Sequence, residues 1–247
     1  MRRVGIMVGS GALQLGGGFA FAPHSGARQT PFGQASTMPQ VARRGEVEVV
    51  MLARHGDDHR FAPHEINYRA NVHLLAEFDV DGVIAINTVG GIASSASNGA
   101  LVLPDQLIDY SWGRAHSFAA ESDLRHVDFS EPYDAPLRAD LLRAAGRADI
   151  VLQDGGVYGC TQGPRFETAA EIVRLERDGC TLVGMTGMPE AGLAREIGLP
   201  YASVCLVVNP AAGKAQAIDL AEISEIAATG MTRVARLLDV FLQGLET

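Results

Sequence analysis

Three short polar turns follow apolar, strand-like runs in this sequence, and each would expose backbone N–H groups. Residues 9–11 are Gly-Ser-Gly, residues 54–56 are Arg-His-Gly, and residues 87–91 are Asn-Thr-Val-Gly-Gly. The first turn, taken alone, is more typical of a tight strand–loop connection, and Arg54 in the second is equally compatible with an anion clamp or a surface salt bridge. Because open α/β sheets bind ligands where their strands end, the three turns together indicate a shared phosphate or oxyanion pocket.

Known phosphate and metal motifs do not fit these turns. Gln14 stands at the third glycine position of a dinucleotide fingerprint, and no Gly-Lys-Ser/Thr follows to make a P-loop. His55 and His59 have the spacing of a zinc-binding helix pair, but Gly56 replaces the glutamate of that motif, and Gly-Asp-Asp is poor helix material. We therefore expect no metal at these histidines.

Two later segments place polar groups beside predicted helices. Glu167 directly precedes one helix, where a carboxylate commonly complements the helix dipole. Residues 184–190 (Gly-Met-Thr-Gly-Met-Pro-Glu) run from a strand into a helix that Pro189 would begin. On these residues alone, Met185 is expected in the core and Glu190 is expected to act only at the helix start.

Apolar, β-branched runs alternate along the chain with amphipathic stretches, and these elements would position the polar segments. This pattern predicts an α/β protein with a largely buried sheet. No linker, charge block or repeat divides the sequence, so we expect one domain over residues 1–247. Strands are expected at Val4–Val8, Val47–Leu52, Gly82–Asn87, Ile150–Tyr158, Thr181–Gly184 and Ala202–Val208, and helices at Glu65–Phe78, Ala135–Ala145, Thr168–Asp178, Pro189–Ile197 and about Leu220–Leu242.

Composition and charge argue against several classes of protein. The chain has 247 residues, 47% of them hydrophobic, and a formal net charge of −9, which disfavours non-specific binding to nucleic acid or to an anionic membrane. Its three cysteines are widely spaced without a C-x-x-C pair, which disfavours a disulfide framework and fits a reducing compartment. Because no signal-peptide core and no membrane-spanning apolar run is present, we expect a cytoplasmic protein.

Four of the segments form an ordered set of motifs. They are residues 52–56 (Leu-Ala-Arg-His-Gly), 67–71 (Asn-Tyr-Arg-Ala-Asn), 163–168 (Gly-Pro-Arg-Phe-Glu-Thr) and 185–190 (Met-Thr-Gly-Met-Pro-Glu). Together they resemble the trimeric purine nucleoside phosphorylase and methylthioadenosine phosphorylase family, and the similarity runs from Val4 through the last predicted helix. The resemblance implies a single-domain purine/uridine phosphorylase-like α/β fold, with a mixed, partly barrel-like central sheet flanked by helices, assembled as a homotrimer.

The resemblance also implies a reaction, in which inorganic phosphate attacks the ribose C1′ of a purine nucleoside and the purine leaves. The bound phosphate can stabilise the sugar cation and then capture it, so no enzyme nucleophile is required. The family needs no metal or organic cofactor, and phosphate is a co-substrate. Matched motif by motif, the side chains of Ser10, Arg54 and Thr186 would bind phosphate, the turn at Thr88 would add a backbone N–H, and His55 would lie close by.

The same motifs imply residues for the nucleoside. Met185 would pack under the ribose, and His59 would approach the 5′ substituent from the neighbouring subunit. Asn67 and Tyr68 would lie in the substrate-side segment of the family. The expected partners are therefore a purine nucleoside and phosphate, with no nucleic acid and no membrane.

Base recognition and the catalytic handling of the departing purine would depend on Glu167 and Asn209. The adenine-specific methylthioadenosine branch has aspartates at the positions of Asn209 and Ala211. An amide at position 209 can donate to purine N7 and O6, and Glu167 can accept from the N1–H that a 6-oxopurine carries. These residues favour a 6-oxopurine over adenine; the alternative is that Asn209 only caps the turn before Pro210.

The 5′ end points to a methylthio substrate. Ordinary 6-oxopurine nucleoside phosphorylases place a histidine for the 5′-hydroxyl near the position of Leu220, where an apolar residue would instead pack a thiomethyl group. Leu220 is equally compatible with a core position in the last helix.

We therefore expect phosphorolysis of 5′-methylthioinosine to hypoxanthine and 5-methylthioribose 1-phosphate. The alternatives within this class are a broader inosine/guanosine phosphorylase and an adenine-specific methylthioadenosine phosphorylase. From a different class, the chain would be a non-catalytic nucleoside-binding sensor, which would not need to keep the phosphate residues Arg54 and Thr186.

Overall fold

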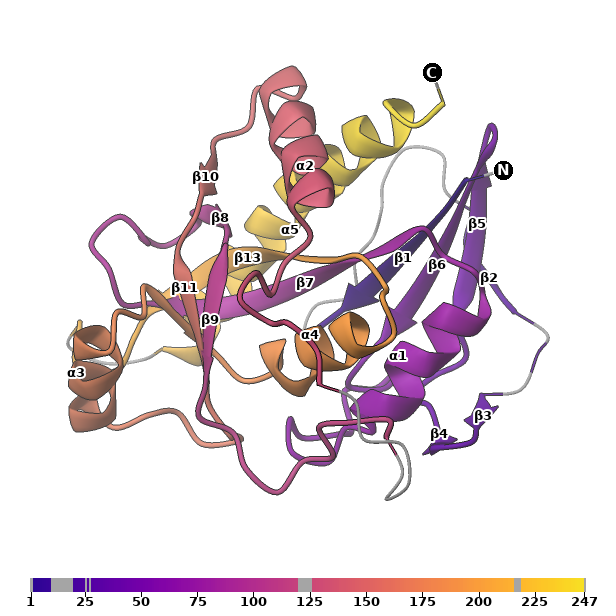
Figure 1. Cartoon of the computed structure of the whole chain (residues 1–247). Coiled ribbons are helices and arrows are strands. Elements are labelled where there is room, and N and C mark those ends of the chain that lie inside the picture. Colours follow the sequence, from indigo (N-terminus) through magenta and orange to yellow (C-terminus); the bar gives the residue numbers. More distant parts are fainter. Residues whose placement is uncertain are drawn as a thin grey trace.

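The computed structural model describes residues 2–9, 20–24, 26, 28–119, 126–215 and 219–246. Within this part of the chain, eleven strands form one mixed sheet (Figure 1). They are β1 (Arg2–Val8), β2 (Ala22–Pro23), β5 (Gln40–Arg44), β6 (Val47–Ala53), β7 (Gly82–Gly91), β8 (Leu101–Leu103), β9 (Gln106–Asp109), β10 (Leu152–Asp154), β11 (Val157–Cys160), β12 (Leu182–Gly184) and β13 (Tyr201–Pro210). β3 (Gln29–Thr30) and β4 (Gly33–Gln34) pair separately.

The long strand β7 lies at the centre of the sheet. β1 and β13 flank it, both parallel to it, and β6 continues the parallel order beyond β1. These strands are buried over most of their length, and continuous apolar runs are typical of parallel strands with both faces covered. The parallel order brings the carboxyl ends of β1, β6, β7 and β13 to one edge, the usual ligand edge of such sheets.

One part of the sheet closes into a ring. β13 pairs with β8, which continues across Pro104 and Asp105 into β9, and β9 pairs with β11. β11 pairs with β12, and β12 returns antiparallel to β7 at Gly90 and Gly91. These pairings form the partly barrel-like sheet that the sequence predicted, at the carboxyl end of β7.

The five helices in the described chain are α1 (Tyr68–Glu77), α2 (Ala135–Arg147), α3 (Ala169–Arg177), α4 (Gly187–Glu196) and α5 (Leu220–Gln243). Four of them cover the two faces of the sheet, and α3 packs in a separate apolar cluster. α2 and α5 lie on one face and α1 and α4 on the other (Figure 1). Alternate residues of β7 serve the two cores, since Ile84 and Ile86 pack towards α2 and α5 while Val83 and Ala85 pack towards α1 and α4.

The sequence predicted the main elements but missed several strands. The predicted strand Ile150–Tyr158 is two strands, β10 and β11, separated at Gly155 and Gly156, which both have positive φ. The short strands β2 to β5, β8 and β9 were not predicted. Among the described residues, no helix is both long and apolar enough to cross a lipid bilayer.

Candidate active site

A cleft of about 570 Å³ lies where the strand ends meet. Nine of the predicted site residues line it: Arg54, His55, His59, Thr88, Glu167, Met185, Thr186, Asn209 and Leu220. Ser10 lies outside the described residues, but its neighbour Gly9, directly after β1, also lines the cleft. The structure therefore brings the predicted residues together, and their individual roles remain predictions.

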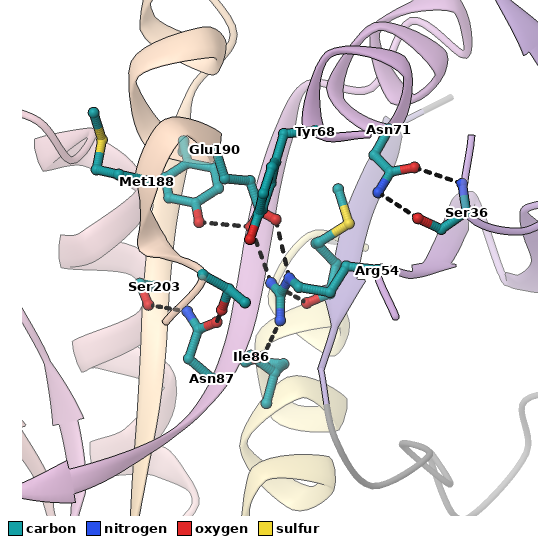
Figure 2. Close-up of polar contacts among 12 residues, drawn as sticks. Ser36, Arg54, Tyr68, Asn71, Ile86, Asn87, Met188, Glu190 and Ser203 are labelled. Atoms are coloured by element: carbon teal, nitrogen blue, oxygen red, sulfur yellow. Dashed lines mark hydrogen bonds and ion pairs between the residues drawn. The ribbon is translucent and has the colours of Figure 1, made fainter. Parts of the chain in front are cut away.

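Arg54 is fully buried at the end of β6 and held in a fixed orientation (Figure 2). Its Nε and Nη2 donate to the two carboxylate oxygens of Glu190, each at 2.9 Å. Nη2 also donates to the carbonyl of Met7, and Nη1 donates to the carbonyl of Ile86. A guanidinium has five N–H groups, so one N–H on Nη1 remains available to a ligand.

That remaining N–H lies next to the Gly9 backbone. A Cβ at position 9 would lie 2.8 Å from Nη1 of Arg54, so only glycine allows the chain to approach this closely. Burial alone would lower the pKa of Arg54, but the charge and hydrogen bonds of Glu190 raise it overall, so the guanidinium stays charged. The charged guanidinium, which lines the cleft, therefore keeps one N–H that no group of the described chain binds.

Glu190 is the residue that the sequence interpretation underestimated. It does lie in the first turn of α4, but its fully buried carboxylate binds Arg54 and accepts a hydrogen bond from the Tyr201 hydroxyl at 2.8 Å. The expectation that it acts only at the helix start is wrong, and so is the surface salt bridge considered for Arg54. The only sequence signal was that a buried arginine needs a carboxylate partner, which does not say where the partner lies.

Thr186 is fixed by a chain of buried polar groups. It occupies the N-cap position of α4 without making a side-chain capping bond. Instead its hydroxyl donates to Oδ1 of Asn87 at 3.0 Å, and Nδ2 of Asn87 donates to the Ser203 hydroxyl at 2.7 Å (Figure 2). Because all three residues are buried, this chain holds the threonine hydroxyl at the cleft wall.

His55 and His59 stack at the cleft entrance, with ring centroids 4.3 Å apart and planes 24° apart. His55 Nδ1 lies 2.8 Å from the carbonyl of Phe61, so Nδ1 carries the proton and Nε2 is left as an acceptor. Burial is the main cause that lowers the pKa of His55 to about 4. The charge of Arg54 also lowers this pKa, whereas the hydrogen bond to Phe61 raises it. His59 also lines the cleft, and its approach to the 5′ substituent from a neighbouring subunit stays a prediction.

The lowered pKa of His55 predicts a pH-dependent stability. Between its ordinary value of 6.5 and about 4, the unfolded chain binds a proton that the folded chain does not. Stability is therefore lost as the pH falls through this window, by at most about 3 kcal/mol, and the loss levels off below it. Urea unfolding at several pH values should show a shallower decline for His55→Gln than for the wild type; parallel curves would contradict the assignment.

Glu167, Asn209 and Leu220 also line the cleft. Glu167 accepts a 2.6 Å hydrogen bond from the Thr161 hydroxyl, which orients its carboxylate. Asn209 is 7% exposed and its Nδ2 donates to the Pro210 carbonyl at 2.7 Å, so it contacts the turn as well as the cleft and keeps a second N–H for a ligand. Leu220 begins α5 and is 66% exposed, so it is not a core residue of that helix.

Two expected substrate-side residues lie elsewhere. Neither Asn67 nor Tyr68 lines the cleft. Asn67 caps α1 through the N–H of Ala70, and the Tyr68 hydroxyl donates to the carbonyl of Pro63. Tyr68 therefore supports the loop at Pro63, which lines the cleft, without lining the cleft itself.

The comparison with protein families identifies the group to which this geometry belongs. The model described as "Phosphorylase superfamily" matches residues 3–243, nearly the whole chain. The chain belongs to the phosphorylase superfamily. The family and fold predicted from the sequence motifs are thus confirmed, including the mixed sheet flanked by helices.

Individual members of the superfamily resemble the chain over most of their length. A probable S-methyl-5′-thioinosine phosphorylase of Pseudomonas syringae pv. tomato is 49% identical over 212 residues, 85% of this chain and 86% of the relative. A 6-oxopurine nucleoside phosphorylase of Pyrococcus furiosus is 41% identical over 224 residues, 86% of this chain and 81% of the relative. Both names agree with the predicted enzyme class.

The structural comparison leads to the same superfamily. A methylthioadenosine phosphorylase from Schistosoma mansoni, solved in complex with adenine, has a TM-score of 0.89 and 29% sequence identity. The match covers 100% of this chain and 93% of that one. The superfamily fold is therefore shared with an adenine-binding relative, so the choice of base depends on the residues of the cleft.

Proposed function

We propose that this protein catalyses phosphorolysis of 5′-methylthioinosine to hypoxanthine and 5-methylthioribose 1-phosphate. The single observation that carries the proposal is the composition of one cleft. Arg54 and Thr186 lie at its anion side, while Asn209 and Glu167 lie at its purine side. The names of the sequence relatives support the same reaction.

We infer that each side of the cleft has a separate task. Breaking the N-glycosidic bond leaves positive charge on the sugar and negative charge on the purine. Phosphate held at Arg54 and Thr186 stabilises the sugar cation and then bonds to C1′. On the other side, an N–H of Asn209 stabilises the departing purine at N7 and O6, and Glu167 accepts from N1–H. The protein contributes orientation and hydrogen bonds that strengthen as charge develops.

We expect the 5′ end of the cleft to favour a methylthio group over a hydroxyl. Leu220 and Ile223 form an apolar patch at the start of α5, which would leave a hydroxyl unpaired. The kcat/KM for 5′-methylthioinosine should exceed that for inosine. The ratio should correspond to a difference of roughly 1–3 kcal/mol in transition-state free energy. Leu220→His should reduce this preference, while Val151→His, at an exposed residue away from the cleft, should not. Equal efficiencies in the wild type would leave a broader inosine/guanosine phosphorylase.

The test of the proposed function is a panel of nucleosides. The purified protein is incubated with 5′-methylthioinosine, inosine, guanosine or 5′-methylthioadenosine, with and without phosphate, and the released base is quantified. Base release that requires phosphate is the expected result. Thermal stabilisation by nucleosides without any turnover would favour the nucleoside-binding sensor instead.

The remaining features of the proposal concern assembly and requirements. We propose a cytoplasmic homotrimer that uses phosphate as co-substrate and needs no metal or organic cofactor. The resemblance of its motifs to the trimeric family supports the assembly, and light scattering of the purified protein tests it. Turnover that persists after dialysis against a chelator tests the independence from metal.

A further inference from the structure

Arg114 is a buried arginine that the sequence motifs did not single out. It is 8% exposed, and among the described residues no carboxylate lies within ion-pair distance of it. Its Nε is buried without a hydrogen-bond partner, so its two terminal nitrogens make all of its hydrogen bonds to the described residues. A buried cation without a counter-charge is costly, and here backbone carbonyls offset that cost.

Those carbonyls come from two neighbouring segments that both continue into the wall of the cleft, the one after β11 and the one after β12, where the Thr161 N–H donates to the carbonyl of Gly184. Nη2 donates to the carbonyls of Thr161 and Gln162, at 3.3 and 2.8 Å, in the loop that leads from β11 to Glu167. Nη1 donates to the carbonyl of Met185 at 2.9 Å and to that of Met188, on either side of Thr186. One guanidinium therefore joins the base-binding loop to the phosphate-binding turn.

The planar fork of arginine is what makes this connection possible. Its two terminal nitrogens carry four N–H groups directed to fixed points, whereas a lysine ammonium has only three on one atom. The guanidinium carbon of Arg114 lies over the Tyr68 ring, 5.3 Å from the ring centroid. Nη1 of Arg114 also donates to the Tyr68 hydroxyl at 3.3 Å. The Asn-Tyr-Arg-Ala-Asn motif therefore supports the cleft through Arg114.

We propose that Arg114 is a positioning residue that sets the separation between the purine contacts at Glu167 and the phosphate contacts at Thr186. The inference rests on the proposed function, because the reaction needs both ligands aligned on one C1′ atom. Each half of the site keeps its own contacts without Arg114. The residue therefore controls the alignment of the two substrates more than the affinity for either one.

Arg114→Lys is the informative variant, because it keeps the charge and removes the fork. We expect kcat to fall at least about tenfold, since small misplacements of reactants are costly, while both KM values change by less than about threefold. Hydrogen exchange should speed up together in peptides covering residues 161–168 and 185–189. A purely structural role would lower the melting temperature and leave kcat per folded molecule unchanged.

Arg138→Lys is the matched control. Arg138 also bonds backbone carbonyls, those of Leu103 and Pro104, and it pairs with Asp154, but its partners lie in neither of the two segments that Arg114 joins. Its replacement should affect stability without changing kcat or exchange in the two cleft peptides.

Three results would overturn the inference: kcat retained within about twofold in Arg114→Lys, a change confined to KM, or unchanged exchange in either peptide. A wild type that releases no base from any nucleoside would refute the proposed function. In that case the exchange data still decide whether Arg114 joins the two segments.

Discussion

Replacing Arg54 with methionine is expected to abolish phosphate-dependent turnover and to lower the free energy of unfolding by about 3–5 kcal/mol. The stability loss is this large because Glu190, also fully buried, would lose its ion-pair partner and keep only the Tyr201 hydroxyl among its described contacts. The activity loss follows because the remaining N–H of Nη1 is the one charged donor that Arg54 directs to the phosphate side. Urea unfolding and phosphate-dependent base release measure the two effects separately.

The double variant Arg54→Met/Glu190→Leu separates the structural from the catalytic role. Replacing both members of a buried ion pair with apolar residues is often neutral for stability, so most of the lost stability should return. Turnover should not return, because the phosphate donor is still missing. A double variant as unstable as the single one would mean that the pair does not account for the loss, and recovered turnover would remove Arg54 from the phosphate site.

The wild-type protein is expected to prefer 5′-methylthioinosine over 5′-methylthioadenosine by orders of magnitude in kcat/KM. Adenine would present the lone pair of its N1 to the Glu167 carboxylate and an amino group to an amide N–H of Asn209. Mismatched groups left unpaired in a desolvated site carry large penalties. Asn209→Asp should shift the preference towards the adenine nucleoside, with Glu167 limiting the shift. A wild type that already favours 5′-methylthioadenosine would contradict this role of Asn209.

Introducing both aspartates of the adenine-specific branch, at positions 209 and 211, would also change the packing of the protein. Ala211 is 2% exposed and packs in an apolar cluster with Ile92, Ile172 and Val183. An aspartate there would bury a carboxyl group, so Ala211→Asp combined with Asn209→Asp tests stability as well as specificity. Comparing the single and double variants, with unfolding measured for each, separates the two effects.

The main strands and the cleft could be predicted from sequence for related physical reasons. Parallel strands covered on both faces require continuous apolar runs, and their carboxyl ends meet at one edge, so residues such as Arg54 and Thr88 were predicted close together. β8 and β9 were missed because Pro104 interrupts them and each strand is short. β5 was missed because polar and charged residues make up most of it.

The supporting residues could not be predicted in the same way. Arg54 and Glu190 are 136 positions apart in the chain, and no local pattern specifies which distant carboxylate meets which arginine. Arg114 makes its contacts with backbone carbonyls, which every residue carries, so side-chain types hold no signal for it. The motifs identified most of the residues that line the cleft, whereas the contacts of the supporting residues became apparent only in three dimensions.

The position of β13 has a consequence for how the chain reaches its native state. β13 is the last strand in the sequence, yet it lies between β7 and β8 and completes the ring. During synthesis, β7 and β8 therefore wait with unpaired edges until Tyr201–Pro210 leaves the ribosome, and such edges invite pairing with other chains. Because its closing pairs join residues far apart in sequence, the ring belongs to the slow-folding class of topologies. A nascent chain that stops before β13 lacks the part of the cleft wall that Val208 and Asn209 form, so its site is incomplete.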